Sequence, residues 1–197
     1  MAFLVLLALV VGLALWFVSV YNGLIGLKNQ VVNAWKQIDV QLKRRHDLIP
    51  NLVNTVKGAM NFERDTLEAV VSARNKAISA SATGNVHTTA EAEGQLTGAL
   101  SRLLAVVEAY PQLKATANVS QLQEELTSTE NKIAFARQLY NDTATLYNTR
   151  QAQFPANLVA STAGAHPVEL WEIGEAVERN VPIVDLSFGA NKPTTTA

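Results

Sequence analysis

The chain contains no cysteine, which excludes disulfide bonds, thiolate catalysis and thiolate metal sites. Proline and glycine are scarce, with 6 and 10 residues among 197. Alanine, leucine, valine, glutamine and asparagine dominate the middle of the chain, a composition typical of a helical protein. Net charge is also small, at −1. A chain without a broad basic field is not expected to bind nucleic acid in general.

Charge is missing altogether from the side chains at the start of the sequence, where the first charged residue is Lys28. Residues 2–20 form an almost unbroken apolar run. About 20 such residues let a helix cross the roughly 30 Å core of a bilayer. No basic residue precedes the run, and Phe17 and Val18 make a poor cleavage site, so the pattern predicts an uncleaved anchor rather than a signal peptide.

Basic residues then dominate the segment that follows the apolar run. These basic residues are Lys28, Lys36, Lys43, Arg44 and Arg45, and Asp39 is the one acidic residue among them. Basic residues close to a membrane span tend to stay in the cytoplasm. We therefore expect a single-pass protein with its N-terminus outside and its bulk in the cytoplasm, with a periplasmic location as the alternative.

A helical pattern continues beyond the predicted span. Apolar residues recur at three- and four-residue steps from residue 49 to residue 78, which predicts that the membrane helix extends as one long bundle helix. Pro50 lies inside this pattern and predicts a kink. Thr83, Gly84 and Asn85 supply a stop and a turn.

Two capping-box spacings predict where further helices begin. Thr88 with Glu91 starts the second helix, which we expect to end at Tyr110 because a proline follows it. Ser120 with Gln123 starts the third. Short connections between three such helices indicate antiparallel packing.

The sequence thus predicts an all-α fold in which a single N-terminal transmembrane helix continues into an antiparallel bundle of three to four long helices. The anchor is assigned to residues 1–22 and the bundle to residues 23–154. Residues 155–189 are expected to form a loop, a short amphipathic helix over 168–179 and an extended piece. Residues 190–197 are expected to be a disordered tail.

No catalytic pattern is evident. His46, His87 and His166 are scattered, and no pair has the spacing of a helical zinc site. A phosphate-cradling glycine loop and a nucleophile elbow are both missing from the sequence. We therefore expect no enzyme activity, no cofactor, no metal and no small-molecule substrate.

A basic cluster is the first candidate interaction site. Lys43, Arg44 and Arg45 are most simply a solvated helix face. The alternative is that they contact the acidic segment that starts with Glu169 and Glu172, within one subunit or between subunits.

A repeated aromatic pair is the second candidate. Tyr140-Asn141 and Tyr147-Asn148 stand seven residues apart, which places both tyrosines on one helix face. Core packing with a polar rim is the simpler interpretation, and a binding groove is the alternative. Pro50, at the predicted bend, completes the set of candidate interaction residues.

Several motifs, in order along the chain, resemble the LemA family. They include Ile-Asp-Val-Gln-Leu-Lys-Arg-Arg at 38–45, Asp-Leu-Ile-Pro-Asn-Leu-Val at 47–53, Tyr-Pro-Gln-Leu-Lys-Ala at 110–115, Tyr-Asn at 140–141 and 147–148, and Phe-Pro at 154–155. The resemblance implies a bacterial inner-membrane protein with one N-terminal span and a helical bundle. It implies no activity and no catalytic residues. Asn61 stands where the family often has histidine, and the match thins after Pro155.

Two functions of different classes fit these features. The first is a membrane-anchored helical scaffold or interaction protein that associates with itself, since an exposed apolar stripe generally marks a partner surface. The second is a regulatory or accessory subunit of another membrane or envelope-stress protein, such as a protease. Both functions use lipid as a partner through the N-terminal helix.

Overall fold

The structure is a computed structural model that describes residues 1–57, 63–114 and 116–172. Every regular element in these ranges is a helix: α1 Ala2–Lys57, α2 Arg64–Ala82, α3 Val86–Glu108, α4 Pro111–Lys114, α5 Ala117–Ala152 and α6 Asn157–Ala160. The predicted all-α fold, with one long apolar N-terminal helix leading into a helical bundle, is confirmed.

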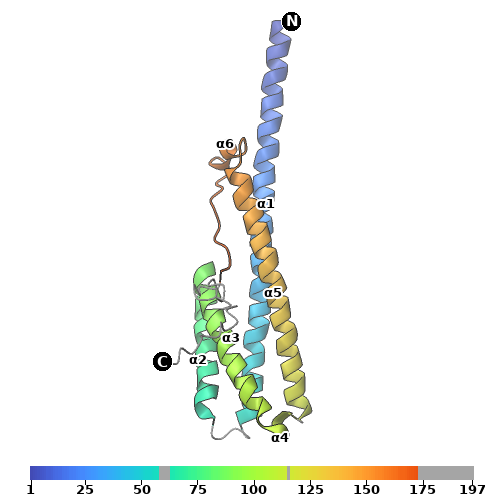
Figure 1. Cartoon of the computed structure of the whole chain (residues 1–197). Helices are drawn as coiled ribbons and strands as arrows, with labels where there is room; N and C mark the ends of the chain where they lie inside the picture. Colours follow the sequence, from blue (N-terminus) through green and yellow to red (C-terminus); the bar gives the residue numbers. More distant parts are fainter. Residues whose placement is uncertain (58–62, 115, 173–197) are drawn as a thin grey trace, which may run out of the picture.

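Helix α1 has two parts with different surroundings. Its N-terminal part projects beyond all other elements (Figure 1), and its most apolar stretch has no residue buried within the protein. Among the described residues it is the one helix long and apolar enough to cross a membrane. Its C-terminal part is a wall of the bundle, so the same rod serves both regions.

The boundary between α1 and α2 corrects the prediction of one continuous helix to residue 78. Helix α1 runs through Pro50 without ending there and is described as far as Lys57, and α2 begins at Arg64, directly after the non-helical residue Glu63. Both helices bury apolar residues in the same core, including Val56 of α1 and Val70 of α2. The periodic pattern therefore continued although the helix did not.

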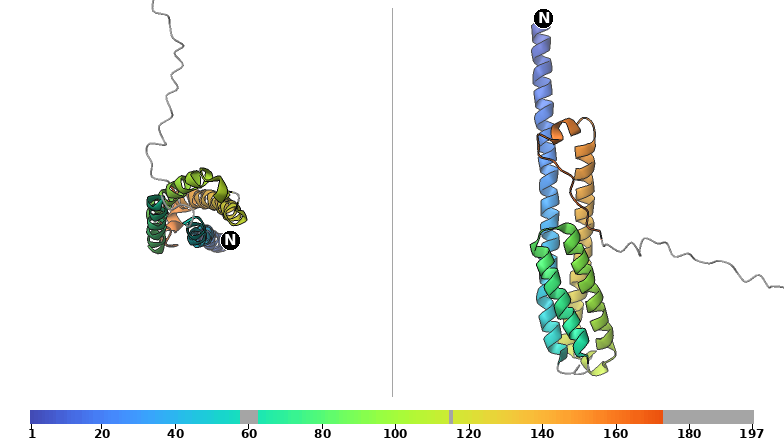
Figure 2. Two further views of the ribbon diagram at one scale, coloured as in Figure 1. Left: turned by 90° about the horizontal axis from the view of Figure 1, so that it is seen from below. Right: turned by 90° about the vertical axis from the view of Figure 1, so that its left-hand side faces the viewer.

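The four long helices run alternately down and up. Helix α5 returns beside α1 over most of the bundle, and the α2–α3 hairpin covers only the half farther from the N-terminus (Figures 1 and 2). Seen along the axis in Figure 2, α1 lies between α2 and α5, and α3 lies opposite α1. Part of the α1–α5 pair is therefore left uncovered by the hairpin.

Apolar burial follows this division. The core of the four-helix half includes Leu52, Leu103 and Leu126. The core nearer the N-terminus lies between α1 and α5 and includes Ile38 and Ile133. Each fully buried side chain of this size contributes about 1.5–3 kcal/mol relative to exposure.

The helix starts correct both capping-box assignments. Asn85 caps α3, because its Oδ1 accepts a hydrogen bond of 2.8 Å from the Thr88 amide. Thr88 is therefore inside the helix. Likewise α5 begins at Ala117, three residues before Ser120. In both cases an S/T-x-x-E/Q spacing occurred within a helix, where it has no capping role.

The segment after α5 also differs from expectation. Residues 168–172 are neither helix nor strand, so the amphipathic helix predicted over 168–179 does not start there. The remainder of that prediction, the extended piece over 181–188 and the tail over 190–197 lie outside the described residues.

Two glycines test the turn between α2 and α3. Gly84 has φ of 69°, a left-handed conformation that costs an L residue about 1–2 kcal/mol. Gly98 lies inside α3 with open space around its Cα. We expect Gly84→Ala to lower the free energy of unfolding by about 1 kcal/mol and Gly98→Ala to raise it by about 0.5–1 kcal/mol. Urea unfolding in detergent measures both, and equal shifts would contradict the assigned turn.

Candidate functional site

The most unusual feature of the bundle is a buried charge on α1. Arg45 is 1% exposed, and its guanidinium contacts two other helices. Its Nη2 donates to Glu93 of α3, and its Nη1 donates to Glu130 of α5 at 2.5 Å and to Thr97 of α3 at 3.0 Å. Because an arginine is always charged, these acceptors are needed to offset its removal from water.

The neighbouring residue extends the contact to the fourth helix. His46 Nε2 lies 2.7 Å from the second oxygen of Glu93. Arg74, on α2, donates through Nε to the main-chain carbonyl of His46 at 2.7 Å. We call Arg45, His46, Glu93 and Glu130 the charge network. With Arg74 it joins all four long helices at one level.

Electrostatics keep Glu93 ionised. Burial by itself raises the pKa of Glu93, but the hydrogen bond from His46 and the charge of Arg45 outweigh burial, so the pKa lies below its usual value. Burial and the nearby charge of Arg45 lower the pKa of Arg137 on α5. Glu93 is therefore a carboxylate at neutral pH, although its side chain is fully buried.

These contacts correct the view of residues 43–45 as one solvated face. Lys43 and Arg44 are exposed, as that view requires, but Arg45 points into the bundle. Among the described residues, its ion pairs are with Glu93 and Glu130. Pro50, one turn beyond the network, is half-buried within α1.

The tyrosine-asparagine repeat forms a second cluster, on α5. Tyr140 and Tyr147 are buried in the core between α1 and α5, as the core-packing interpretation predicts. The asparagine after each tyrosine forms hydrogen bonds with the main chain of the segment that follows α6. Asn141 donates to the carbonyl of Trp171 at 3.0 Å and accepts from its amide at 2.8 Å.

The second asparagine repeats this pairing one heptad later. Asn148 donates to the carbonyl of Val168 at 2.8 Å and accepts from its amide at 2.9 Å. Seven helical residues rise about 10.5 Å, close to the roughly 10 Å that three extended residues span. The spacing of the two asparagines therefore matches an extended chain. We call residues 165–172, held in this way, the strap.

An aromatic layer joins the strap to α1 and α5. The Trp171 ring lies 5.8 Å from Trp35 of α1, and the Arg137 guanidinium lies 4.9 Å from the Trp171 ring centroid. Tyr140 donates to the Glu169 carbonyl at 2.7 Å. Burial, with a smaller effect from the Glu169 charge, raises the pKa of Tyr140, so its hydroxyl remains a donor.

The two acidic candidates, Glu169 and Glu172, lie on the strap. The side chains of Glu169 and Glu172 are exposed on the strap, and Glu169 contributes through its main chain. In the described part of the chain no group of three or more His, Asp or Glu residues is placed to hold a metal ion.

Sequence reasoning missed Glu93, Glu130 and the role of the asparagines. Glu93 had one usable signal, since it lies on the face of α3 that carries Leu96 and Leu100, where a charge requires a partner. The asparagines had a second signal, because amide side chains repeated every seven residues beside buried tyrosines can pair with main chain.

An apolar rod that continues into a helical bundle defines a membrane-associated, all-helical protein. The family comparison makes this class specific. The LemA family model matches residues 34–186, so the chain belongs to the LemA family. The match includes the charge network, the tyrosine-asparagine repeat and the strap.

Individual relatives are similar over the same extent. Protein LemA of Metamycoplasma hominis is 28% identical, covering 83% of this chain and 73% of that protein. Magnetosome protein MamQ 1 of Paramagnetospirillum magneticum is 24% identical, and magnetosome protein MamQ of Magnetospirillum gryphiswaldense is 22% identical. Each covers 83% of this chain and 68% of the relative. None of these names specifies a reaction.

Removing the arginine should expose the importance of the network. Arg45→Ala leaves the buried Glu93 carboxylate without its arginine partner, and we expect a loss of about 3–5 kcal/mol in unfolding free energy. The matched control is Arg44→Ala, an exposed neighbour, with a change below about 0.5 kcal/mol. Urea unfolding followed by circular dichroism measures both, and similar losses would contradict a special role for Arg45.

Stability should also depend on pH through Glu93. Its pKa is lower in the folded than in the unfolded protein, so its stabilising contribution is present above the ordinary value of 4.5 and is lost as pH falls through the lowered value. We expect the unfolding free energy to decrease as the pH is lowered below about 4.5. Glu93→Gln should make this dependence of unfolding free energy on pH less steep. Identical slopes for both proteins in urea titrations would contradict the assignment.

Proposed function

We propose that this protein is a single-pass membrane scaffold, without catalytic activity, that associates with itself through the outer face of α1 and α5. The observation that carries this proposal is an apolar surface at the mouth of the groove between the two helices. Val40 of α1 and Phe135 of α5 are 62% and 71% exposed, although both are large and apolar. Leu139 and Leu146 extend the surface along α5. We call these four residues the outer stripe.

Membrane anchoring favours a second copy as the occupant. Anchored copies share one orientation and one distance from the bilayer, so the outer stripes of neighbouring copies meet at the same height. Confinement to two dimensions also raises their effective concentration. A face that meets its own copy forms the symmetric contact common in homo-oligomers.

A second candidate function is an accessory subunit of another membrane protein. The observation that favours it is the basic rim of the same groove, which Lys36 and Lys132 line. Two lysines beside an apolar surface suit a partner that carries acidic groups. A second copy docked on this groove would instead bring its own Lys36 and Lys132 close to the same two lysines.

Charge on the outer stripe separates these functions. We expect purified protein in mild detergent to be oligomeric by light scattering, and Phe135→Glu with Leu139→Glu to convert it to a monomer. Val71→Glu, on the exposed face of α2, is the control and should remain oligomeric. A wild-type monomer contradicts self-association. A stoichiometric foreign protein recovered from native membranes supports the accessory role.

The proposed location is the inner membrane of a bacterium, with the bundle in the cytoplasm. The basic residues after the span support this orientation. Since the chain lacks cysteine, Ser128→Cys on the exposed face of α5 gives a single label site. We expect an impermeant maleimide to label it only after the cells are permeabilised. Labelling of cells with an intact inner membrane would place the bundle in the periplasm.

A further inference from the structure

The corner between α5 and α6 lies beside the base of the apolar rod. Ala160 and Ala163 are buried against Leu24 of α1, and Val20 and Tyr21 pack against the same cluster. Figure 1 shows α6 next to α1 at the upper end of α5, at the level where the rod begins to project beyond the other helices. The corner is therefore level with the end of the predicted membrane span.

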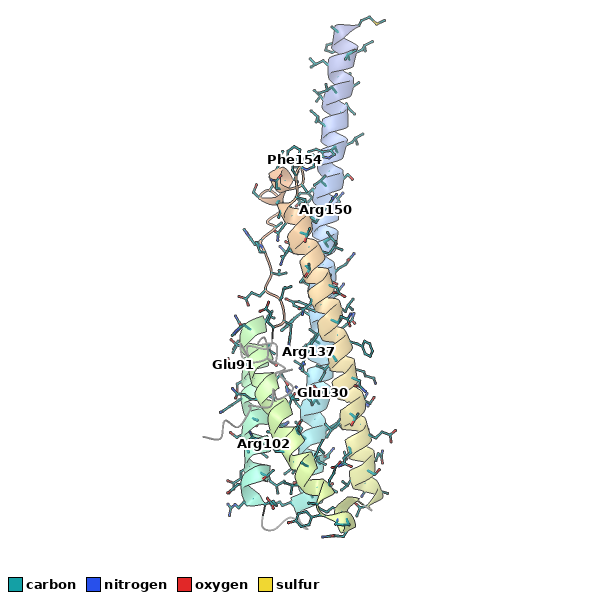
Figure 3. The ribbon with its side chains drawn as sticks, in the orientation of Figure 1. Glu91, Arg102, Glu130, Arg137, Arg150 and Phe154 are labelled. Carbon is teal, nitrogen blue, oxygen red and sulfur yellow. The ribbon has the colours of Figure 1, made fainter. Side chains whose placement is uncertain are left out.

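This corner has an inner and an outer side. Val159 and Ala160 of α6 are buried toward the protein. Phe154 and Leu158 are instead 79% and 65% exposed. Figure 3 shows Phe154 at the upper end of α5, next to α1. Two large apolar side chains are thus mostly exposed on the corner beside the apolar rod.

The composition of the corner is equally distinctive. Residues 151–168 contain no Asp, Glu, Lys or Arg. Basic groups lie just outside this stretch. Arg150 is exposed in the last turn of α5, as Figure 3 shows, and Lys28 donates through Nζ to the Gly164 carbonyl at 3.3 Å. Apolar and aromatic residues beside basic ones are typical of a segment at a membrane interface.

We propose that the corner between α5 and α6 docks on the lipid bilayer, with Phe154 and Leu158 inserted at the interface as a second membrane contact. The geometry of the span selects lipid as the occupant. Residues 2–20 rise about 28 Å as a helix, close to the roughly 30 Å of a bilayer core. Their lower end is at Val20, which packs in the same cluster as α6. Lipid around the rod therefore continues onto the corner.

The second contact fixes how the bundle stands on the membrane. A bundle held only by one rod is free to tilt toward the bilayer on any of its sides. Contact at the corner brings the same side of the bundle down to the bilayer in every copy. This inference rests on the proposed membrane anchoring of α1, so the experiment must report on the two contacts separately.

Site-directed spin labelling on the full chain makes that separation. Because the chain has no cysteine, Leu158→Cys, Leu9→Cys and Val71→Cys each carry one nitroxide. All three positions are exposed, on the corner, on the rod and on α2. The protein is reconstituted in nanodiscs of phosphatidylethanolamine and phosphatidylglycerol. Collision rates with oxygen, which concentrates in lipid, are compared with those of a water-soluble nickel chelate.

We expect the Leu158 label to resemble Leu9, with oxygen collisions exceeding those of the chelate, and the Val71 label to show the reverse. A Leu158 label that resembles Val71, while Leu9 remains lipid-exposed, overturns the corner contact and leaves the anchor intact. A Leu9 label accessible to the chelate overturns the anchor itself. A Leu158 label closed to both reagents with spin–spin broadening shows a second copy instead of lipid, and also overturns the proposal.

Discussion

The buried guanidinium of Arg45 is the contact on which the arrangement of the helices depends. A charge removed from water is stabilised only where oxygen ligands of opposite charge meet it with good geometry. Those ligands are Glu93 and Glu130, on helices that are distant in sequence. A shift of one turn, about 5.4 Å, in either helix would separate the charges. The network therefore specifies the register of α1, α3 and α5, whereas apolar packing alone tolerates sliding.

The same residue connects this register to the membrane. Arg45 belongs to α1, which is one helix from Ala2 to Lys57, so no joint separates the apolar rod from the bundle. The position of the rod along its own axis sets the height of the charge network, the strap and the corner between α5 and α6. The two asparagines that hold the strap lie on α5, whose register Glu130 fixes. Contacts near the membrane thus follow from a contact in the middle of the bundle.

Much of this fold is readable from the sequence. The apolar run at residues 2–20 and the periodic pattern of the long helices led to the all-α bundle, and Gly84 indicated the turn between α2 and α3. Helix starts were read less well, because the capping-box spacing also occurs within helices, as at Thr88. The break between α1 and α2 was missed because both helices bury residues in one core, so the periodicity carried no sign of it.

The site was predictable only in part, for a physical reason. Arg45 lies between exposed and buried positions on α1, and sequence alone does not show which side its long side chain takes. Its partner Glu93 becomes meaningful only when α3 is placed opposite α1. The tyrosines were correctly assigned to the core, whereas the asparagines beside them act on a segment 20 to 30 residues away in sequence. Pairings of this kind arise from the tertiary arrangement and leave no local pattern.

A double-mutant cycle tests the central claim most directly. Arg45→Met, Glu93→Met and the double variant are unfolded in urea, and the coupling free energy is taken from the four unfolding free energies. If the ion pair fixes the register of α1 and α3, the double variant loses less unfolding free energy than the sum of the losses in the two single variants. The difference, which is the coupling free energy, is then at least about 1.5 kcal/mol. Additive losses, within about 0.5 kcal/mol, would contradict it.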